Sequence, residues 1–257
     1  MDENRQITEA VCIHTRKIYD SCRDRDCAED LRVYVSCASQ AYIESAFSVR
    51  PGAATLLYAD VNVDEISFNR GYYTVDVTYF YEVTGTTFPG ENRVRGLCVF
   101  NKRVMLFGSE GTARVFSSDG TAMDSAEQPV AVVECVDPIV LSMRLADASV
   151  TGMNADIREI PQRILDHFGG ELVVADGVRQ LLATLGQFSL IRLERDSQLV
   201  VPVYDYCLPD KECPSSSEDD PCTLFSRIDF PLDEFFPPDS LEGSPDYRSA
   251  IQNLNSQ

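Results

Sequence analysis

Hydrophobic and polar residues alternate along much of this chain, most regularly between residues 73 and 83. Every second position in that stretch is apolar or aromatic, and the positions between are mostly polar. A period of two carried by β-branched and aromatic side chains is typical of a β-strand with one buried face. A second alternating stretch covers 55–66, and the turn-like Asn69-Arg70-Gly71 between them predicts that the two strands pair.

Further strands are predicted before and after this central pair. Leu31 to Cys37 alternates in the same way. Residues 94–107 and 188–206 each indicate a hairpin, with turns at 101–103 and 194–198. Residues 130–145 are apolar but interrupted by Asp137-Pro138, which favours an edge strand or a bent strand.

Two short helices are expected in the second half of the chain. The first runs from about Glu159 to Phe168, with Pro161 near its start and Gly169-Gly170 after its end. The second covers Val178 to Leu185 and is followed by Gly186.

The fold class that follows is mainly β, with antiparallel sandwich-like or barrel-like sheets, one or two short helices and an extended C-terminal tail. Three parts are expected along the chain. Residues 1–50 form an N-terminal cysteine-bearing segment. Residues 51–206 form a β-rich body, which could consist of two subdomains that meet near 120–130. Residues 207–257 form an acidic, proline-rich, cysteine-bearing tail.

The charge of the chain excludes some partners. Asp and Glu number 41 against 22 Lys and Arg, for a formal net charge of −19. Such a surface repels phosphate backbones and anionic lipid, so neither nucleic acid nor a membrane is an expected partner. The polar N-terminus shows no secretory signal, and no apolar run is long enough to span a membrane, so we expect synthesis in the cytoplasm.

Nine cysteines are many for a chain made in the cytoplasm, and the odd number rules out complete internal pairing. Two of them, Cys98 and Cys135, sit in apolar strands and are expected in the core. The other seven are candidates for disulfides or cross-links between chains: Cys12, Cys22, Cys27, Cys37, Cys207, Cys213 and Cys222.

Two alternatives use the same residues for other chemistry. A zinc module could take its four thiolates from the pairs Cys22/Cys27 and Cys207/Cys213, although the second pair is spaced more widely than structural zinc sites usually allow. A cysteine-dependent enzyme would need a histidine base, and only His14, close to Cys12, and His167 are present. No phosphate-binding glycine loop or nucleophile elbow is visible, so we expect no cofactor and no catalytic residues.

Four stretches resemble a family of clostridial proteins that includes outer spore-coat components. They are Tyr19 to Val33, Phe68 to Asp76, Leu106 to Gly111 and, in the tail, Asp229 to Pro238. The resemblance implies a structural role at the spore surface, with synthesis in the mother cell and deposition on the forespore. It implies no catalytic residues, and its partners would be copies of the chain and other coat proteins.

The residues and the resemblance together favour a self-assembling structural protein. The chain would be reduced while it is made and oxidised once the mother cell lyses, so that exposed cysteines join neighbouring subunits. Sheet edges and exchanged terminal segments would supply the contacts for a layer or a filament.

Overall fold

A computed structural model gives the architecture of the chain. It describes residues 12–109, 128–147, 160–169, 172–174 and 179–200, together with Phe225 and Ile228. The remainder of the predicted tail, with Cys207, Cys213 and Cys222, lies outside the described residues, as does most of the stretch near 120–130 where two subdomains were expected to meet.

Nine elements follow one another along the described chain. They are β1 (Cys12–Val35), α1 (Cys37–Ser45), β2 (Ser48–Glu65), β3 (Tyr72–Phe88), β4 (Arg93–Phe107), β5 (Val130–Cys135), β6 (Ile139–Ala146), α2 (Gln162–His167) and β7 (Gln180–Val200). The chain is therefore mainly β with two short helices, as its sequence predicts.

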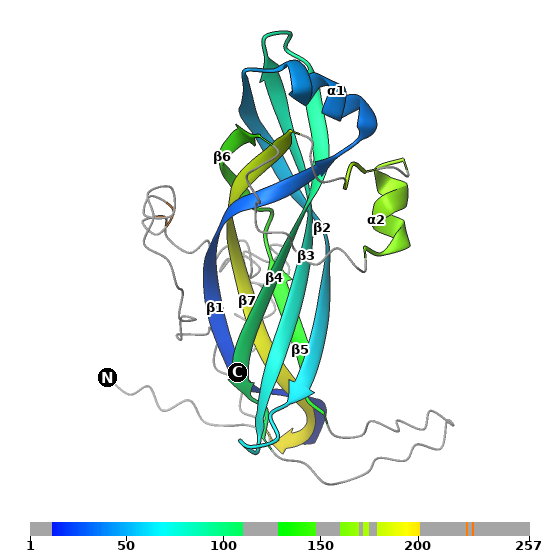
Figure 1. The fold of residues 1–257 in the computed structure, drawn as a ribbon. Coiled ribbons are helices and arrows are strands. Elements are labelled where there is room, and N and C mark those ends of the chain that lie inside the picture. Colours follow the sequence, from blue (N-terminus) through cyan, green and yellow to red (C-terminus); the bar gives the residue numbers. More distant parts are fainter. Residues whose placement is uncertain are drawn as a thin grey trace, which may run out of the picture.

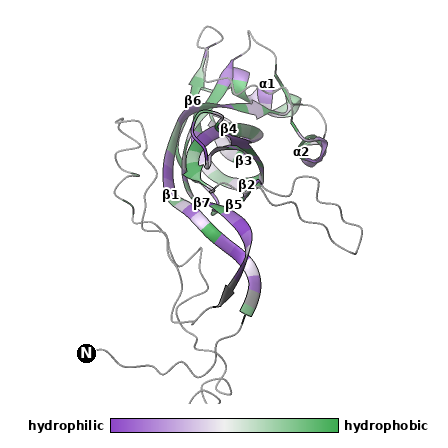
Figure 2. Cartoon of the chain, turned by 90° about the horizontal axis from the view of Figure 1, so that it is seen from below, coloured by the Kyte–Doolittle hydropathy of each residue, from purple (hydrophilic) through white to green (hydrophobic). Residues whose placement is uncertain are grey.

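The strands form one seven-stranded antiparallel sheet that curls into a nearly closed barrel (Figures 1 and 2). The strand order is β2-β3-β4-β1-β7-β5, and β6 pairs with a separate part of β7. The two borders of the sheet approach each other where β2 lies beside β6. There the backbone N–H of Leu56 donates a hydrogen bond of 2.8 Å to the carboxylate of Asp137, between β5 and β6.

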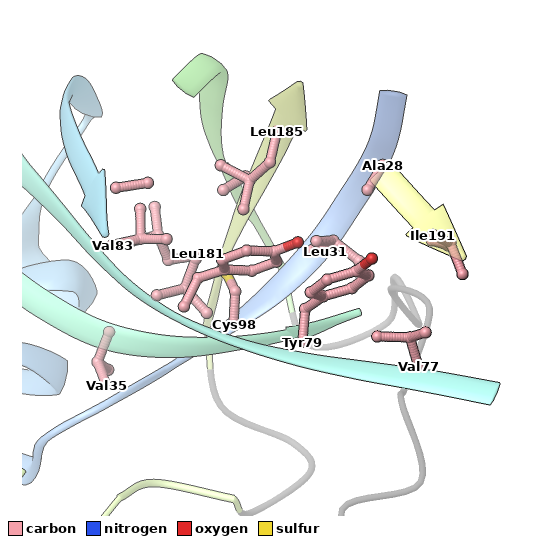
Figure 3. Packing of buried hydrophobic residues seen from close by; sticks show 14 of the residues in the cluster. Ala28, Leu31, Val35, Val77, Tyr79, Val83, Cys98, Leu181, Leu185 and Ile191 are labelled. Atoms are coloured by element: carbon pink, nitrogen blue, oxygen red, sulfur yellow. The ribbon is translucent and has the colours of Figure 1, made fainter. Parts of the chain in front are cut away.

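The core fills the inside of this barrel, because alternate residues of each strand point inward (Figure 3). On β3 these are the odd-numbered positions that the alternation predicts, including Val77, Tyr79 and Tyr81. The interior cluster also contains Ala28, Leu31, Val33 and Val35 of β1, Val94, Cys98 and Leu106 of β4, and Leu181, Ala183, Leu185, Ile191 and Leu193 of β7.

A second, smaller core lies on the outer face of the sheet beneath α2. Ile164 of α2 packs against Tyr34, Phe80 and Leu97, all of them buried. The guanidinium of Arg163 lies 3.3 Å from the centre of the Tyr58 ring, so α2 also covers part of β2. The helix begins after Pro161 and is followed by Gly169 at a φ of 80°, close to the predicted boundaries.

Most of the N-terminal strand β1 belongs to the barrel wall. Strand β1 lies between β4 and β7 and pairs with β7 over most of its length. It ends at Val35 rather than Cys37, because Ser36 accepts a hydrogen bond from the backbone N–H of Ser39 and so caps α1. This helix was not expected from the sequence.

The hairpin predicted at 101–103 is wrong, because β4 continues through these residues. Asn101, Lys102 and Arg103 pair with Thr78, Val77 and Asp76 of β3 without a break in register. Their polar side chains resemble a turn in composition, yet the alternation of inward and outward positions runs through them: Phe100 and Val104 both border the interior core.

Two predictions for β7 are also wrong. Residues 178–185 were expected to form a helix, but from Gln180 they extend as a strand between β1 and β6. Pairing with two strands distant in sequence outweighs the local helix preference. The turn expected at 194–198 is absent too, since these charged residues continue the ladder, and Asp196 forms an ion pair of 3.5 Å with Arg16 of β1.

Candidate functional site

The exposed thiols lie at the two ends of β1. Cys12 is the first residue of this 24-residue strand, and Cys37 follows its end as the first residue of α1. Both cysteines are free and exposed. In Figure 1, α1 lies at one end of the barrel and β1 begins at the opposite end, so the first residues of these two elements are far apart along the molecule.

Cys12 stands on a two-stranded arm that extends from the barrel. The pairing of β5 with β7 ends at Val130 and Glu194, whereas β1 and β7 continue together as far as Cys12 and Val200. In the part of the chain that the structure describes, no third strand pairs with this extension, and Figure 2 shows it leading away from the ring of strands. Its side chains at His14, Arg16 and Lys17 are exposed.

The other described cysteines are not available as free exposed thiols. Cys98 is fully buried and Cys135 is half-buried, as expected for core residues, and burial raises the pKa of the Cys135 thiol to about 11. Burial raises the pKa of Cys98 as well. Cys22 and Cys27 are both disulfide-bonded.

The geometry of Cys22 and Cys27 bears on the zinc alternative. They are five positions apart on an unbroken part of β1, so their side chains point to opposite faces of the sheet. Cys22 belongs to the interior core, whereas Cys27 lies on the outer face. One ion therefore has no position from which it could reach both sulfurs, and the described residues contain no cluster of three or more metal-binding side chains.

The two histidines lie in different surroundings. His14 is exposed on the arm, two positions from Cys12 on the same face of β1. His167 lies at the end of α2, where its Nε2 is 2.5 Å from the Glu82 carboxylate, and Arg95 donates to the same carboxylate at 2.7 Å. The hydrogen bond from Arg95 is the main cause that lowers the pKa of Glu82. This group fastens α2 to the outer face of β3 and β4.

A charged group inside the barrel was missed by the sequence interpretation. Lys102 of β4 points inward, where its ammonium contacts Asp24 and lies 2.5 Å from the carboxylate of Asp26. Burial raises the pKa of Asp26 to about 7 and lowers that of Lys102 to about 8. The signal was present in the sequence: both acids occupy alternate positions of β1, and Lys102 sits between two inward apolar residues.

Uncharged polar groups share this layer of the interior. Ser189 and Gln187 of β7 stand opposite Asp24 and Asp26 in the ladder. Tyr79 and Tyr81 of β3 belong to the same interior, and Figure 3 shows the Tyr79 ring among the core side chains. The Tyr79 hydroxyl has the Ser189 side chain as its hydrogen-bond neighbour. The Gln187 carbonyl oxygen and the Tyr81 hydroxyl are buried without a hydrogen-bond partner within the described part of the structure. The barrel therefore holds a polar layer between two apolar ones.

Comparison with known proteins finds no relative of this chain. No family model, no curated protein and no solved structure matches the chain. No helix among the described residues is long and apolar enough to cross a membrane. The class that fold and site define is thus a nearly closed antiparallel barrel with exposed free thiols at Cys12 and Cys37.

Proposed function

We propose that this chain is a non-enzymatic structural protein that assembles with copies of itself and is then fixed by disulfide cross-links. The observation that carries the proposal is the position of Cys12 and Cys37, free and exposed at opposite ends of one long strand. A subunit with one reactive group at each end can be linked on both sides, and repeated linkage gives an extended chain of subunits.

The arm supplies a contact that can bring the thiols together before they react. Both of its strands have one border that is not paired by any described residue, and such borders bind further strands through their backbone N–H and C=O groups. In the barrel itself β2 lies beside β6, so the arm is the more accessible border. Assembly through the arm would place Cys12 at the joint between subunits.

Formation of the cross-link needs an oxidant. Two thiols lose two protons and two electrons to form one disulfide, and molecular oxygen or an oxidised low-molecular-weight disulfide can accept the electrons. In a reducing cytoplasm the thiols stay free, and exposure to an oxidising medium makes the joint permanent. The formal charge of −19 keeps unassembled chains soluble.

The setting we propose is the surface of a spore. The support is the resemblance of residues 19–33, 68–76 and 106–111 to a clostridial family that includes outer spore-coat components, together with the exposed thiols. The chain would be made in the cytoplasm of the mother cell and deposited on the spore, where its partners are copies of itself and other coat proteins. Immunogold labelling of sectioned spores tests this setting, and label confined to the vegetative cytoplasm would contradict it.

Controlled oxidation tests the molecular function. The full chain is purified reduced, transferred to an oxidising buffer and run on a non-reducing gel. We expect a ladder of multimers for the unmodified chain and nothing larger than a dimer for the variant Cys12→Ser/Cys37→Ser, because one cysteine of the C-terminal part can still join two chains. Cys135→Ala, which removes a half-buried thiol, serves as the matched control and should keep the ladder. A monomer band for the unmodified chain would contradict the proposal.

A further inference from the structure

The amide of Gln187 is fixed inside the barrel with its oxygen unsatisfied. The side chain is 1% exposed, and its Nε2 donates hydrogen bonds to the backbone carbonyls of Val136 at 2.9 Å and of Phe188 at 2.6 Å. These two bonds set the orientation of the amide. Its carbonyl oxygen is buried and accepts no hydrogen bond within the described part of the structure. Buried acceptors of this kind are rare in folded proteins, and bound water commonly satisfies them.

Other oxygen atoms of the polar layer are in the same position. The Tyr81 hydroxyl, Oδ1 of Asp24 and Oδ2 of Asp26 are buried and form no hydrogen bond with any described residue. Asp26 is the direct partner of Gln187 in the ladder of β1 and β7, so their inward side chains are neighbours. Burial is the main cause that raises the pKa of Tyr81, and the charge of Asp26 adds to it, so the hydroxyl and this carboxylate lie close together.

Short side chains make room in this layer. Ser189 of β7 pairs with Asp24 of β1 on one side and with Cys135 of β5 on the other, so three short residues lie in one row across neighbouring strands. The Tyr79 hydroxyl reaches this row from β3, with the Ser189 side chain as its neighbour. A barrel interior is filled by large residues placed against small ones. A small molecule is therefore best accommodated beside the short row.

The polar layer reaches solvent at the seam between β1 and β4. Backbone pairing across this seam is limited to residues 34–35 of β1 and 96–97 of β4. Beyond them side chains make the connection: Asp20 accepts a hydrogen bond of 3.1 Å from the backbone N–H of Phe107, and Lys102 contacts the two interior aspartates. The side chain of Lys102 is 11% exposed. Solvent can thus reach the layer without separation of a backbone ladder.

We propose that the polar layer is a binding site for ordered water, held by the oxygens of Gln187, Tyr81 and the two interior aspartates. The amide and carboxylate oxygens need donors, and the tyrosine hydroxyl is the one donor among these groups. Water donates two hydrogen bonds and accepts others without adding charge. A second cation would be repelled by the Lys102 ammonium, and an anion by the carboxylates. The site lies within one chain and does not rest on the proposed assembly.

A high-resolution crystal structure of the unmodified full chain tests the site. We expect an ordered water within hydrogen-bond distance, about 2.5–3.0 Å, of the Gln187 carbonyl oxygen and of the Tyr81 hydroxyl. Direct hydrogen bonds from protein groups to these two oxygens, with no water between them, would overturn the proposal. A metal ion in this position would overturn it as well.

Solvent relaxation tests the site in solution. Magnetic relaxation dispersion of water oxygen detects water that stays bound for longer than the protein takes to tumble. The unmodified chain should show this dispersion. Asp26→Asn/Tyr81→Phe should show a lower amplitude, because the asparagine amide can donate directly to Gln187 and the phenylalanine ring has no hydroxyl.

Tyr42→Phe is the matched control for the solution measurement. It also removes one hydroxyl, but from a side chain on α1 that is 40% exposed, and it should leave the amplitude unchanged. Equal amplitudes in all three chains would place the long-lived water elsewhere and contradict the proposal. No dispersion in the unmodified chain would contradict it too.

Discussion

Nζ of Lys102 lies 2.5 Å from Oδ1 of Asp26 inside the barrel, and the same ammonium contacts Asp24, whose side chain is fully buried. Two carboxylates thus share one cation in an interior that is otherwise mostly apolar. One of them lacks a counter-charge when both are ionised, and burial penalises that charge. Asp26 is the carboxyl that keeps its proton up to neutral pH, with a pKa raised to about 7.

Asp26 gives stability a pH dependence. Its pKa is near 3.8 when unfolded and about 7 when folded, so between these values the folded chain binds more protons. Its contribution to the free energy of unfolding is present below pH 4 and is lost as the pH rises to 7. The variant Asp26→Asn has no carboxyl to ionise here, so its free energy of unfolding does not fall in this way as the pH rises. We expect the variant to be more stable than the unmodified chain at pH 8 by about 2 kcal/mol.

Urea unfolding of both chains at pH 5 and pH 8 measures this difference. The gap between Asp26→Asn and the unmodified chain should be smaller at pH 5 than at pH 8. Asp76→Asn is the control, because this carboxylate pairs with the exposed Arg103 on the outer surface. A gap that does not change between the two pH values would show that Asp26 is ionised throughout.

Removal of the ammonium should have the opposite effect. Lys102→Met keeps most of the side-chain volume but leaves Asp24 buried without its cation, and breaking a buried pair on one side costs about 3–5 kcal/mol. We expect a large drop in the urea midpoint at pH 7. In Lys102→Met/Asp24→Asn the remaining polar group is neutral, so part of the loss should return. A single variant as stable as the unmodified chain would contradict the account of this group.

The attachment of α2 depends on Glu82. Its side chain is 19% exposed and accepts hydrogen bonds from Arg95 and His167. The lowered pKa means that this contribution is present above pH 4.5 and is lost as the pH falls below that value. Glu82→Gln should cost about 1–2 kcal/mol at pH 7.

Hydrogen exchange locates this effect. In Glu82→Gln we expect faster exchange of the amides of α2, from Gln162 to His167, while β7 stays protected. Asp166→Asn changes an exposed carboxylate on the same helix and is the matched control. Equal exchange of α2 in the unmodified chain and in Glu82→Gln would mean that the apolar contacts of Ile164 alone hold the helix.

The alternation of the central strands was sufficient to predict where they lie. Residues 73–83 and 55–66 do form adjacent strands, and Pro161 and Gly169 do bracket a short helix. In these segments the local pattern and the final environment agree, because one face of each strand is buried and the other is not. The interruption at Asp137-Pro138 likewise separates β5 from β6.

The errors occurred where distant pairing decides the structure. Residues 180–185 are buried on both faces of the sheet: Leu181, Ala183 and Leu185 lie in the interior core, and the outward Gln180, Leu182 and Thr184 are also buried. With Leu182 among the outward residues, the alternation of apolar and polar positions is incomplete. Lys102 looked like part of a turn because its two partners are on β1, almost eighty residues earlier. No local window of sequence contains that information.

The sequence was sufficient to name the candidate cysteines, but not to tell which of them are free and which are disulfide-bonded. All seven candidates look alike in sequence, whereas the structure separates exposed free thiols at Cys12 and Cys37 from bonded cysteines at Cys22 and Cys27. The two free thiols lie where β1 begins and where α1 begins, whereas the two bonded cysteines lie within the part of β1 that β7 pairs with in the barrel wall. Cys98 and Cys135 could be assigned to the interior because their strands are apolar on both sides.

Sedimentation velocity over a range of concentrations tests the central claim most directly, with the full chain first in reductant and then after oxidation. We expect sedimentation coefficients that increase with concentration in reductant, and after oxidation large species that persist on dilution and disappear when reductant is restored. Electron microscopy of the oxidised sample should show extended chains of barrels. A single species of constant size in every condition would contradict assembly through the arm and the two exposed thiols.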